Sequence, residues 1–186
     1  MTITEIKTEK KRYLSLLLLA DEQEDMIDRY LDRGTMYVLE DDGVKAECVI
    51  TDEGNGVLEI KNIATDPAHQ GRGYGKALID FLTDRYAGKY SILQVGTGDS
   101  PLTVPFYEKC GFIRSHVIPN FFTDNYDHPI IEDGVQLVDM VYLRRRLEKV
   151  TELDIGKANK KLDEGAGFCG KQNHQRYSFV QERIAK

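Results

Sequence analysis

The sequence predicts an α/β (α+β) domain built on a central mixed β-sheet of about seven strands with helices on both faces. The main observation is a strand–helix–strand–helix–strand run between residues 57 and 118, which favours parallel pairing within one sheet. Two further observations agree with it. Segments rich in β-branched and aromatic residues flank the run, and 41% of the 186 residues are apolar, which is enough for a core of domain size.

The first third of the chain is predicted to contain a strand, two helices and an antiparallel hairpin. The elements cover residues 2–7 (strand), 10–20 and 22–33 (helices), and 35–40 and 45–51 (strands). Asp21 separates the two helices, and Gly34 is a suitable stop for the second. The turn Asp41-Asp42-Gly43 joins the last two strands, as expected for a hairpin.

The remaining elements supply the parallel part of the sheet and a return strand. They are a strand over 57–65, a helix opened by a glycine-rich loop at 70–75, a strand over 91–95, a short helix over 103–110, and strands over 112–118 and 135–143. Leu78, Phe81 and Leu82 recur at i, i+3 and i+4 and form the apolar face of the first helix. The connection over 119–134 has 16 residues, a length that suggests a function.

We assign residues 1–147 to this domain and residues 148–186 to a C-terminal extension of undefined role. The extension holds a polar segment over 152–164 that could be helical, and its apolar residues predict that it docks on a surface. Arg144, Arg145 and Arg146 close the last strand and are typical of a solvated face or the rim of a homodimer.

The composition excludes several classes of protein. A net charge of −6 argues against a surface that binds nucleic acid by neutralising phosphates. Cys48, Cys110 and Cys169 are odd in number and far apart, so they predict neither a disulfide framework nor a zinc site, and the four histidines show no metal-ligand spacing. The apolar segment over 13–20 is too short for a membrane span and is flanked by acidic residues, unlike a signal peptide. We therefore expect a cytoplasmic protein without a metal.

The loop from Gln70 to Lys76 is the most informative segment. Its alternating glycines let the backbone amides point outward at the N-terminus of the following helix, where anions bind. A P-loop is excluded because Gln70 stands where its first glycine should be and Ala77 where its hydroxyl should be. A dinucleotide fingerprint is excluded because Lys76 replaces its third glycine.

The pattern Q-x-x-G-x-G from Gln70 to Gly75, after an apolar strand, resembles the GNAT superfamily of acetyl-CoA-dependent N-acetyltransferases. The segment over 106–112, a short helix followed by Gly-Phe, is similar to the second signature of that family and follows at the expected distance. Phe121-Phe122, Asp127-His128-Pro129-Ile130 and Asp139-Met140-Val141 resemble a bacterial subgroup of undefined substrate. The resemblance covers about residues 1–147 and implies the GNAT fold, with the sheet splayed between strands 4 and 5.

The resemblance implies a site for acetyl-CoA as co-substrate. The backbone of Ile63, Ala64 and Thr65 would pair with the pantetheine arm, and a loop of seven residues would hold the pyrophosphate: Gln70, Gly71, Arg72, Gly73, Tyr74, Gly75 and Lys76. Relatives often carry an asparagine near the position of Asp99, and its side chain hydrogen-bonds the pantetheine or the acceptor. Because a carboxylate donates no hydrogen bond, Asp99 fits this role only if Ser100 or Thr97 makes the contact in its place.

The resemblance also implies two catalytic residues. Tyr107 matches the tyrosine that protonates the departing thiolate, a role that a phenol with a pKa of about 10 can fill. Glu59 is the candidate base, because a period of two places it on the same strand face as Ile63. The backbone N–H of Ala64 or Thr65 would polarise the carbonyl. The alternatives are a core tyrosine at Tyr107 and a solvated glutamate at Glu59.

The acceptor is expected to be a primary amine of a small molecule or peptide. Phe121, Phe122 and Tyr126 in the long connection, next to several carboxylates, could hold a cationic amine by cation–π contact and ion pairing. The resemblance implies direct attack of the amine in a ternary complex. The alternative from another class is a catalytically silent acyl-CoA-binding or regulatory module, suggested by Asp99 and by the extension.

Overall fold

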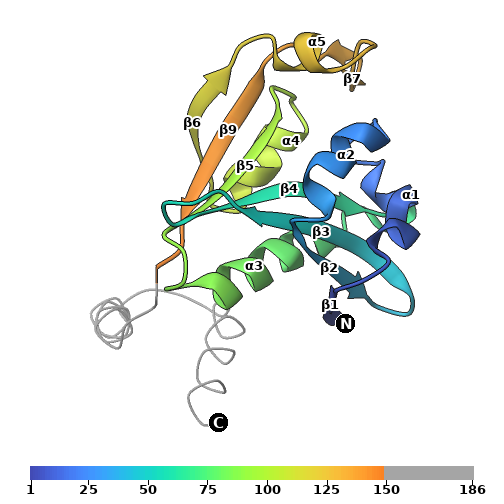
Figure 1. The fold of residues 1–186 in the computed structure, drawn as a ribbon, viewed down its shortest axis with the longest axis vertical. Helices are drawn as coiled ribbons and strands as arrows, with labels where there is room; N and C mark the ends of the chain where they lie inside the picture. Colours follow the sequence, from blue (N-terminus) through green and yellow to red (C-terminus); the bar gives the residue numbers. More distant parts are fainter. Residues whose placement is uncertain (149–186) are drawn as a thin grey trace, which may run out of the picture. The chain divides into compact units, whose positions relative to one another are not determined.

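The computed structural model describes residues 1–148 and contains a seven-stranded sheet in the order β1-β2-β3-β4-β5-β9-β6 (Figure 1). The strands are β1 (Thr2–Ile6), β2 (Thr35–Glu40), β3 (Val44–Asp52), β4 (Val57–Thr65), β5 (Ile92–Gly98), β6 (Ile113–Ile118) and β9 (Met140–Arg146), and β7 (Ile131–Glu132) pairs separately with β8 (Val135–Gln136). The α-helices are α1 (Leu14–Leu17), α2 (Glu24–Leu31), α3 (Tyr74–Tyr86), α4 (Thr103–Lys109) and α5 (Phe121–Asn125), with 3₁₀ turns η1 (Lys10–Tyr13) and η2 (Pro67–His69). The predicted seven-stranded mixed sheet is confirmed.

The sheet is antiparallel except where β4 and β5 pair in parallel across the α3 crossover. This parallel register begins at Val57↔Ile92 and ends at Ile60↔Val95. Beyond it β4 and β5 run apart, as Figure 1 shows, while β3 and β9 stay paired with them on their outer sides. The sheet is therefore splayed between its fourth and fifth strands, as predicted.

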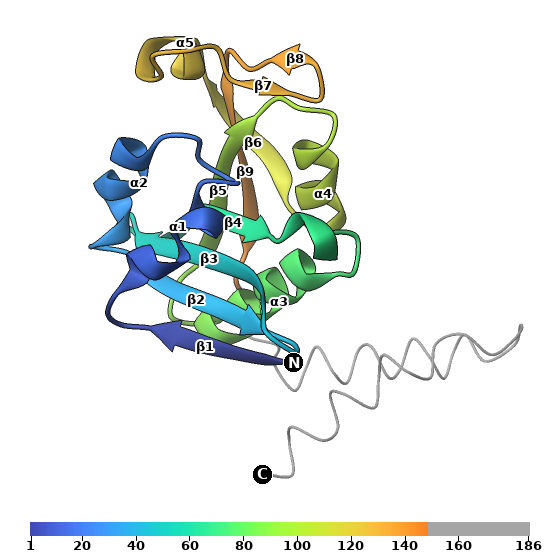
Figure 2. The ribbon, with the colours of Figure 1, turned by 90° about the vertical axis from the view of Figure 1, so that its right-hand side faces the viewer.

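Helices cover both faces of the sheet (Figure 2). On one face α3 and α4 pack over a buried cluster that includes Leu78, Leu82 and Tyr107. On the other face α1 and α2 cover a smaller cluster that includes Leu17 and Ile27. The alternation of β3 separates the clusters, since Ala46, Cys48 and Ile50 enter the first and Val49 enters the second.

Strand β4 contains a β-bulge at Lys61. Ile60 pairs with Ile50 and Asn62 pairs with Val49, so Lys61 has no counterpart on β3. An extra residue shifts the alternation of side chains by one position. Residues before and after Lys61 therefore do not follow a single period of two.

Glu47 on β3 is a fully buried carboxyl group, 0% exposed, opposite Ala64 in the sheet. Neither of its carboxyl oxygens has a hydrogen-bond partner among the residues that the structure describes. Burial raises the pKa of Glu47 to about 8, and the backbone of Ala64 opposes that shift by a smaller amount. A buried carboxyl group without partners is costly when charged, so Glu47 favours its protonated form.

Three predicted elements differ from the structure. The strand expected over 135–143 is interrupted, because Leu137 leaves the ladder to pack with Phe122 and Ile130, and Asp139 accepts a hydrogen bond from the N–H of Asn120. The long strand therefore starts at Met140.

The expected helix over 10–20 is a 3₁₀ turn followed by a single α-helical turn. That geometry places the Lys10 ammonium against the carbonyls of Leu31 and Gly34, at distances of 2.7 and 2.6 Å, where a cation stabilises the end of α2. The connection over 119–134 is also more ordered than predicted, since it contains α5 and β7.

The predictions for residues 149–186 lie outside the described part of the chain. Within residues 1–148, no helix is long and apolar enough to cross a membrane.

Candidate active site

A pocket of about 540 Å³ occupies the splay between β4 and β5. It is lined by β4 on one side, by β5 and β9 on the other, and by residues of α2 and α5 at its outer end. The lining includes Asp21, Arg29, Tyr30, Arg33, Glu59, Lys61, Asn62, Ile63, Ala64, Thr65, Gln70, Thr97, Tyr107, Phe121, Phe122, Tyr126, Glu132 and Tyr142. Most of the predicted site residues are therefore brought to one place.

The inner strand edge of β4 faces this pocket. Ile63, Ala64 and Thr65 pair with β3 on one side, while the parallel pairing with β5 has already ended at Ile60. All three residues line the pocket. The other side of their backbone is thus open to an extended ligand that adds itself as a strand.

The glycine loop lies at the end of β4 and opens α3. Gly71 and Gly73 adopt positive φ angles of 74° and 88°, and Gly73 is the N-cap of the helix. A Cβ atom at Gly75 would approach the Phe106 ring to 3.2 Å, so the close contact with α4 favours glycine there. Since Ala77 donates the first intrahelical hydrogen bond, to Gly73, the preceding N–H groups of the turn point toward an external anion.

Among the cations of this loop, Lys76 forms an ion pair with Asp80 one turn further along α3. Tyr74 donates a hydrogen bond of 2.8 Å to Asp41, which fixes the loop to the β2–β3 hairpin. Gln70 lines the pocket and lies beside the carbonyl of Thr65.

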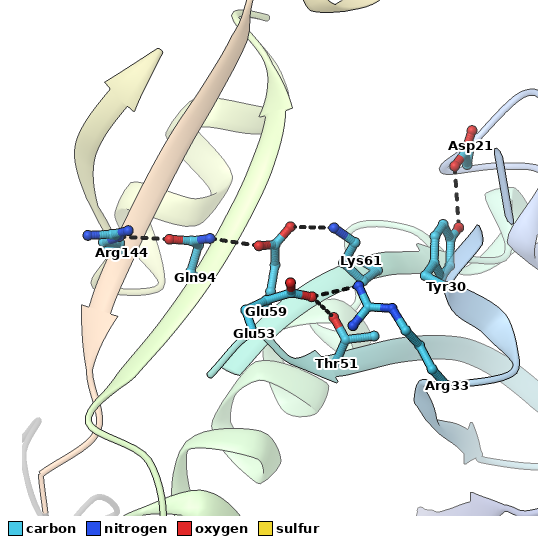
Figure 3. A network of polar contacts seen from close by, with 9 residues as sticks. All are labelled: Asp21, Tyr30, Arg33, Thr51, Glu53, Glu59, Lys61, Gln94 and Arg144. Atoms are coloured by element: carbon cyan, nitrogen blue, oxygen red, sulfur yellow. Dashed lines mark hydrogen bonds and ion pairs between the residues drawn. The ribbon is translucent and has the colours of Figure 1, made fainter. Parts of the chain in front are cut away.

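Glu59 is buried at the inner end of the pocket within a chain of polar contacts (Figure 3). One carboxylate oxygen accepts a hydrogen bond from Lys61 Nζ at 2.7 Å, and the other accepts one from Gln94 Nε2 at 2.6 Å. Arg144 Nε donates to Gln94 Oε1 at 2.7 Å and so fixes the orientation of that amide. The chain joins β9, β5 and β4 at the point where the sheet opens.

The prediction that Glu59 shares a strand face with Ile63 is wrong. Partners in an antiparallel pair share a face, and Glu59 lies opposite Thr51 whereas Ile63 lies opposite Cys48. Because Thr51 and Cys48 are three positions apart on β3, they point to opposite faces. The bulge at Lys61 causes this change of face, and Glu59 lies on the α2 face of the sheet.

Tyr107 on α4 lines the pocket from the other face and is 6% exposed. Its ring makes edge-on contacts with Phe106 and Phe112, with centroid distances of 5.1 and 5.7 Å. Burial raises the pKa of its hydroxyl above the ordinary value, so this group stays protonated at neutral pH. A protonated phenol is a possible proton donor inside the pocket.

Asp99 and Ser100 lie outside the pocket lining. Asp99 forms an exposed ion pair with Arg114 at 3.0 Å, and the buried hydroxyl of Ser100 accepts a hydrogen bond from the N–H of Leu102 at 3.1 Å. Thr97 and Gly98 line the pocket in their place. Like Gly71 to Lys76, which also lie outside this lining, Asp99 and Ser100 stay predictions as cofactor-binding residues.

The outer end of the pocket is formed by α5 and the segment before α2, which lie side by side in Figures 1 and 2. Tyr126 donates a hydrogen bond of 3.0 Å to Asp21, and His128 Nε2 lies 3.3 Å from a Glu22 oxygen. Burial raises the pKa of the Asp21 carboxyl, while the hydrogen bond with Asp127 raises the pKa of His128. The carboxylates of this wall are therefore already occupied by groups of the protein.

Sequence reasoning missed several polar residues of the pocket, Asp21, Arg29, Lys61, Asn62 and Tyr142, and it also missed Gln94, which contacts Glu59 from outside the lining. Desolvation raises the pKa of Tyr142 to about 12, with the Glu59 charge as a further cause. A weak signal was available for Gln94, a polar residue in an otherwise apolar strand. Within residues 1–148 no group of three or more potential metal ligands occurs.

Comparison with known proteins places these features in a family. The family model described as an acetyltransferase (GNAT) domain matches residues 32–114. An uncharacterised N-acetyltransferase of Bacillus subtilis, YvbK, is 36% identical over 131 residues, which make up 69% of this chain and 84% of that protein.

Two solved structures are also similar. A GNAT family acetyltransferase from Elizabethkingia anophelis with acetyl-CoA bound has a TM-score of 0.74 and 33% identity, covering 78% of this chain and 97% of its own. An acetyltransferase of Bacillus subtilis in complex with CoA has a TM-score of 0.71 and 33% identity, covering 77% and 97%.

Proposed function

The chain belongs to the GNAT family of acetyltransferases, and we propose from this premise that it transfers the acetyl group of acetyl-CoA to a primary amine by direct attack in a ternary complex. The observation that carries the proposal is the pocket in the splay, which joins the open edge of β4, Gln70 at the start of the glycine loop, and Tyr107. Neighbouring structures of the family hold acetyl-CoA or CoA, which supports the same co-substrate here.

In the proposed complex the pantetheine arm pairs with the backbone of Ile63 to Thr65. The pyrophosphate binds at the N–H groups that open α3, and Arg72 adds positive charge at the exposed rim. These contacts use backbone groups and the helix terminus, so they tolerate variation in most side chains of the loop.

In the proposed reaction the neutral amine attacks the thioester carbonyl, a C–N bond forms and the C–S bond breaks. Glu59 takes the proton of the amine, directly or through a water molecule, and Tyr107 gives its proton to the departing CoA thiolate. The Lys61 and Gln94 hydrogen bonds hold the Glu59 carboxylate in one orientation at the pocket, which positions it to act as the base.

The first test is thermal melting of the purified protein with and without acetyl-CoA. Ligand at 100 times its dissociation constant is expected to stabilise the fold by about 2.7 kcal/mol, visible as a rise of several degrees in Tm. The same samples are then assayed for CoA release with a panel of amines. No rise in Tm at millimolar acetyl-CoA would contradict the cofactor assignment, and binding without any CoA release would favour a silent acyl-CoA-binding module.

The hydrogen bond from Gln94 gives a second test. Gln94→Met removes a donor that fixes one oxygen of the Glu59 carboxylate, so kcat/KM is expected to fall by about 10-fold or more, because a hydrogen bond to a charged group contributes about 1.5–3 kcal/mol. The measurement is kcat/KM at neutral pH with saturating acetyl-CoA. The exposed Gln136→Met serves as control, and an unchanged kcat/KM in Gln94→Met would argue against Glu59 as the base.

A further inference from the structure

The α2 side of the pocket carries more free positive charge than free negative charge. Arg29, Arg33 and Lys61 line it. Arg33 uses Nη2 on Glu53 at 2.8 Å, and Lys61 uses its ammonium on Glu59 at 2.7 Å. Arg29 has no carboxylate within ion-pair distance among residues 1–148.

The carboxylates on the same side are occupied. Asp21 accepts hydrogen bonds from Tyr126 and Tyr30, at 3.0 and 3.4 Å, and Glu22 lies against His128. Glu132, on β7, also lines the pocket, but its charge acts on Tyr107, on the proposed cofactor side. The two pocket-lining carboxylates next to α2 would therefore not be free to bind a polycationic acceptor, in contrast to the cationic acceptor expected from the sequence.

Asn62 supplies an unused acceptor on the same strand face as Glu59. Its side chain is 2% exposed and lines the pocket. The Nδ2 group donates to the Leu17 carbonyl and to the Tyr30 hydroxyl, both at 2.9 Å, which fixes the amide. Its Oδ1 atom is buried without a hydrogen-bond partner among the described residues, so a donor from a ligand would satisfy it.

We infer that the acceptor is an amine that also carries an anionic group, a carboxylate or a phosphate, with the amine donating to Asn62 Oδ1 and the anion binding to Arg29 and Arg33. The inference rests on the proposed function and names its substrate class. Arg29 on α2 and Arg33 just after it both line the pocket, and each guanidinium presents planar donors that match carboxylate and phosphate oxygens.

The test uses two matched pairs of amines: 2-phenylethylamine with phenylalanine, and ethanolamine with O-phosphoethanolamine. Binding to the full-length protein saturated with CoA is measured by calorimetry. In at least one pair the anionic member is expected to bind 10-fold or more tightly than its neutral partner, and the pair that shows this preference distinguishes carboxylate from phosphate. Equal binding within both pairs, or no binding of either anionic probe at 10 mM, would overturn the inference.

Variants of Arg29 locate the effect. Arg29→Gln is expected to remove the preference for the anionic member, while Arg29→Lys retains part of it. The control is Arg12→Gln, an exposed arginine outside the pocket lining. A preference that survives in Arg29→Gln would contradict the inference.

Turnover separates this inference from the proposed function. Anion-dependent binding without release of CoA from acetyl-CoA would leave the subsite standing and refute the transferase. Release of CoA at equal rates with neutral and anionic amines would support the transferase and refute the anion subsite.

Discussion

Tyr107→Phe is expected to lower kcat by about 100-fold or more at saturating acetyl-CoA, with little change in the affinity for acetyl-CoA. The substitution removes only the hydroxyl that would protonate the thiolate, and general acid catalysis contributes about 10²–10⁴-fold. The phenylalanine ring preserves the edge-on contacts with Phe106 and Phe112, so the fold is retained. The measurement is CoA release at saturating concentrations of both substrates, combined with the Tm shift produced by acetyl-CoA.

Tyr86→Phe is the matched control for Tyr107→Phe. Its hydroxyl lies 2.8 Å from that of Tyr37, outside the pocket lining, so its loss removes a hydrogen bond without touching the proposed site. We expect it to lower Tm slightly and to leave kcat within about 2-fold, the size of an ordinary indirect effect. If Tyr107→Phe keeps its kcat, the proton reaches the thiolate from another group.

The natural protein is expected to lose stability as pH rises, and Glu47→Gln is expected to abolish this loss. The folded protein holds the Glu47 proton up to about pH 8, while the unfolded chain releases it near its ordinary value of 4.5. Between these values the folded state binds more protons, so the free energy of unfolding falls with rising pH, by about 3 kcal/mol from pH 5 to pH 8. Glutamine is neutral throughout and removes this slope.

The measurement is urea unfolding of both proteins at pH 5, 6, 7 and 8. Other groups that titrate in this range, such as His128, contribute equally to both proteins and cancel in the difference. Glu40→Gln, at an exposed position on β2, provides the control with the same chemical change. A difference between Glu47→Gln and the natural protein that does not grow with pH would show that Glu47 is charged in the folded state.

The order of the elements was predictable from the sequence because it depends on local patterns. The turn before Val44, the glycines at the start of α3 and the apolar face of that helix each fix a neighbouring element through short-range geometry. The same holds for the proposed cofactor site, since Ile63, Ala64 and Thr65 lie on one strand and the loop follows directly.

The side chains of the acceptor wall could not be predicted in the same way. Arg29, Asn62 and Tyr142 come from three different elements, and only the tertiary fold brings them to one pocket. The face of Glu59 was mispredicted for a different reason. The bulge at Lys61 is not marked in the sequence by a glycine or a proline, and a lysine fits a regular strand as well as a bulge.

The early end of the β4–β5 pairing has a consequence for association. An unpaired strand edge usually invites other chains to add themselves, with aggregation as the result. Here the open edge over residues 61–65 lies in the interior of the sheet, within a pocket whose outer end is closed by the contact between Tyr126 and Asp21. The walls of the pocket, formed by β5 and β9 on one side and by α2 and α5 at the outer end, stand where a neighbouring chain would have to add a strand. The open backbone edge is therefore shielded from edge-to-edge pairing with other proteins.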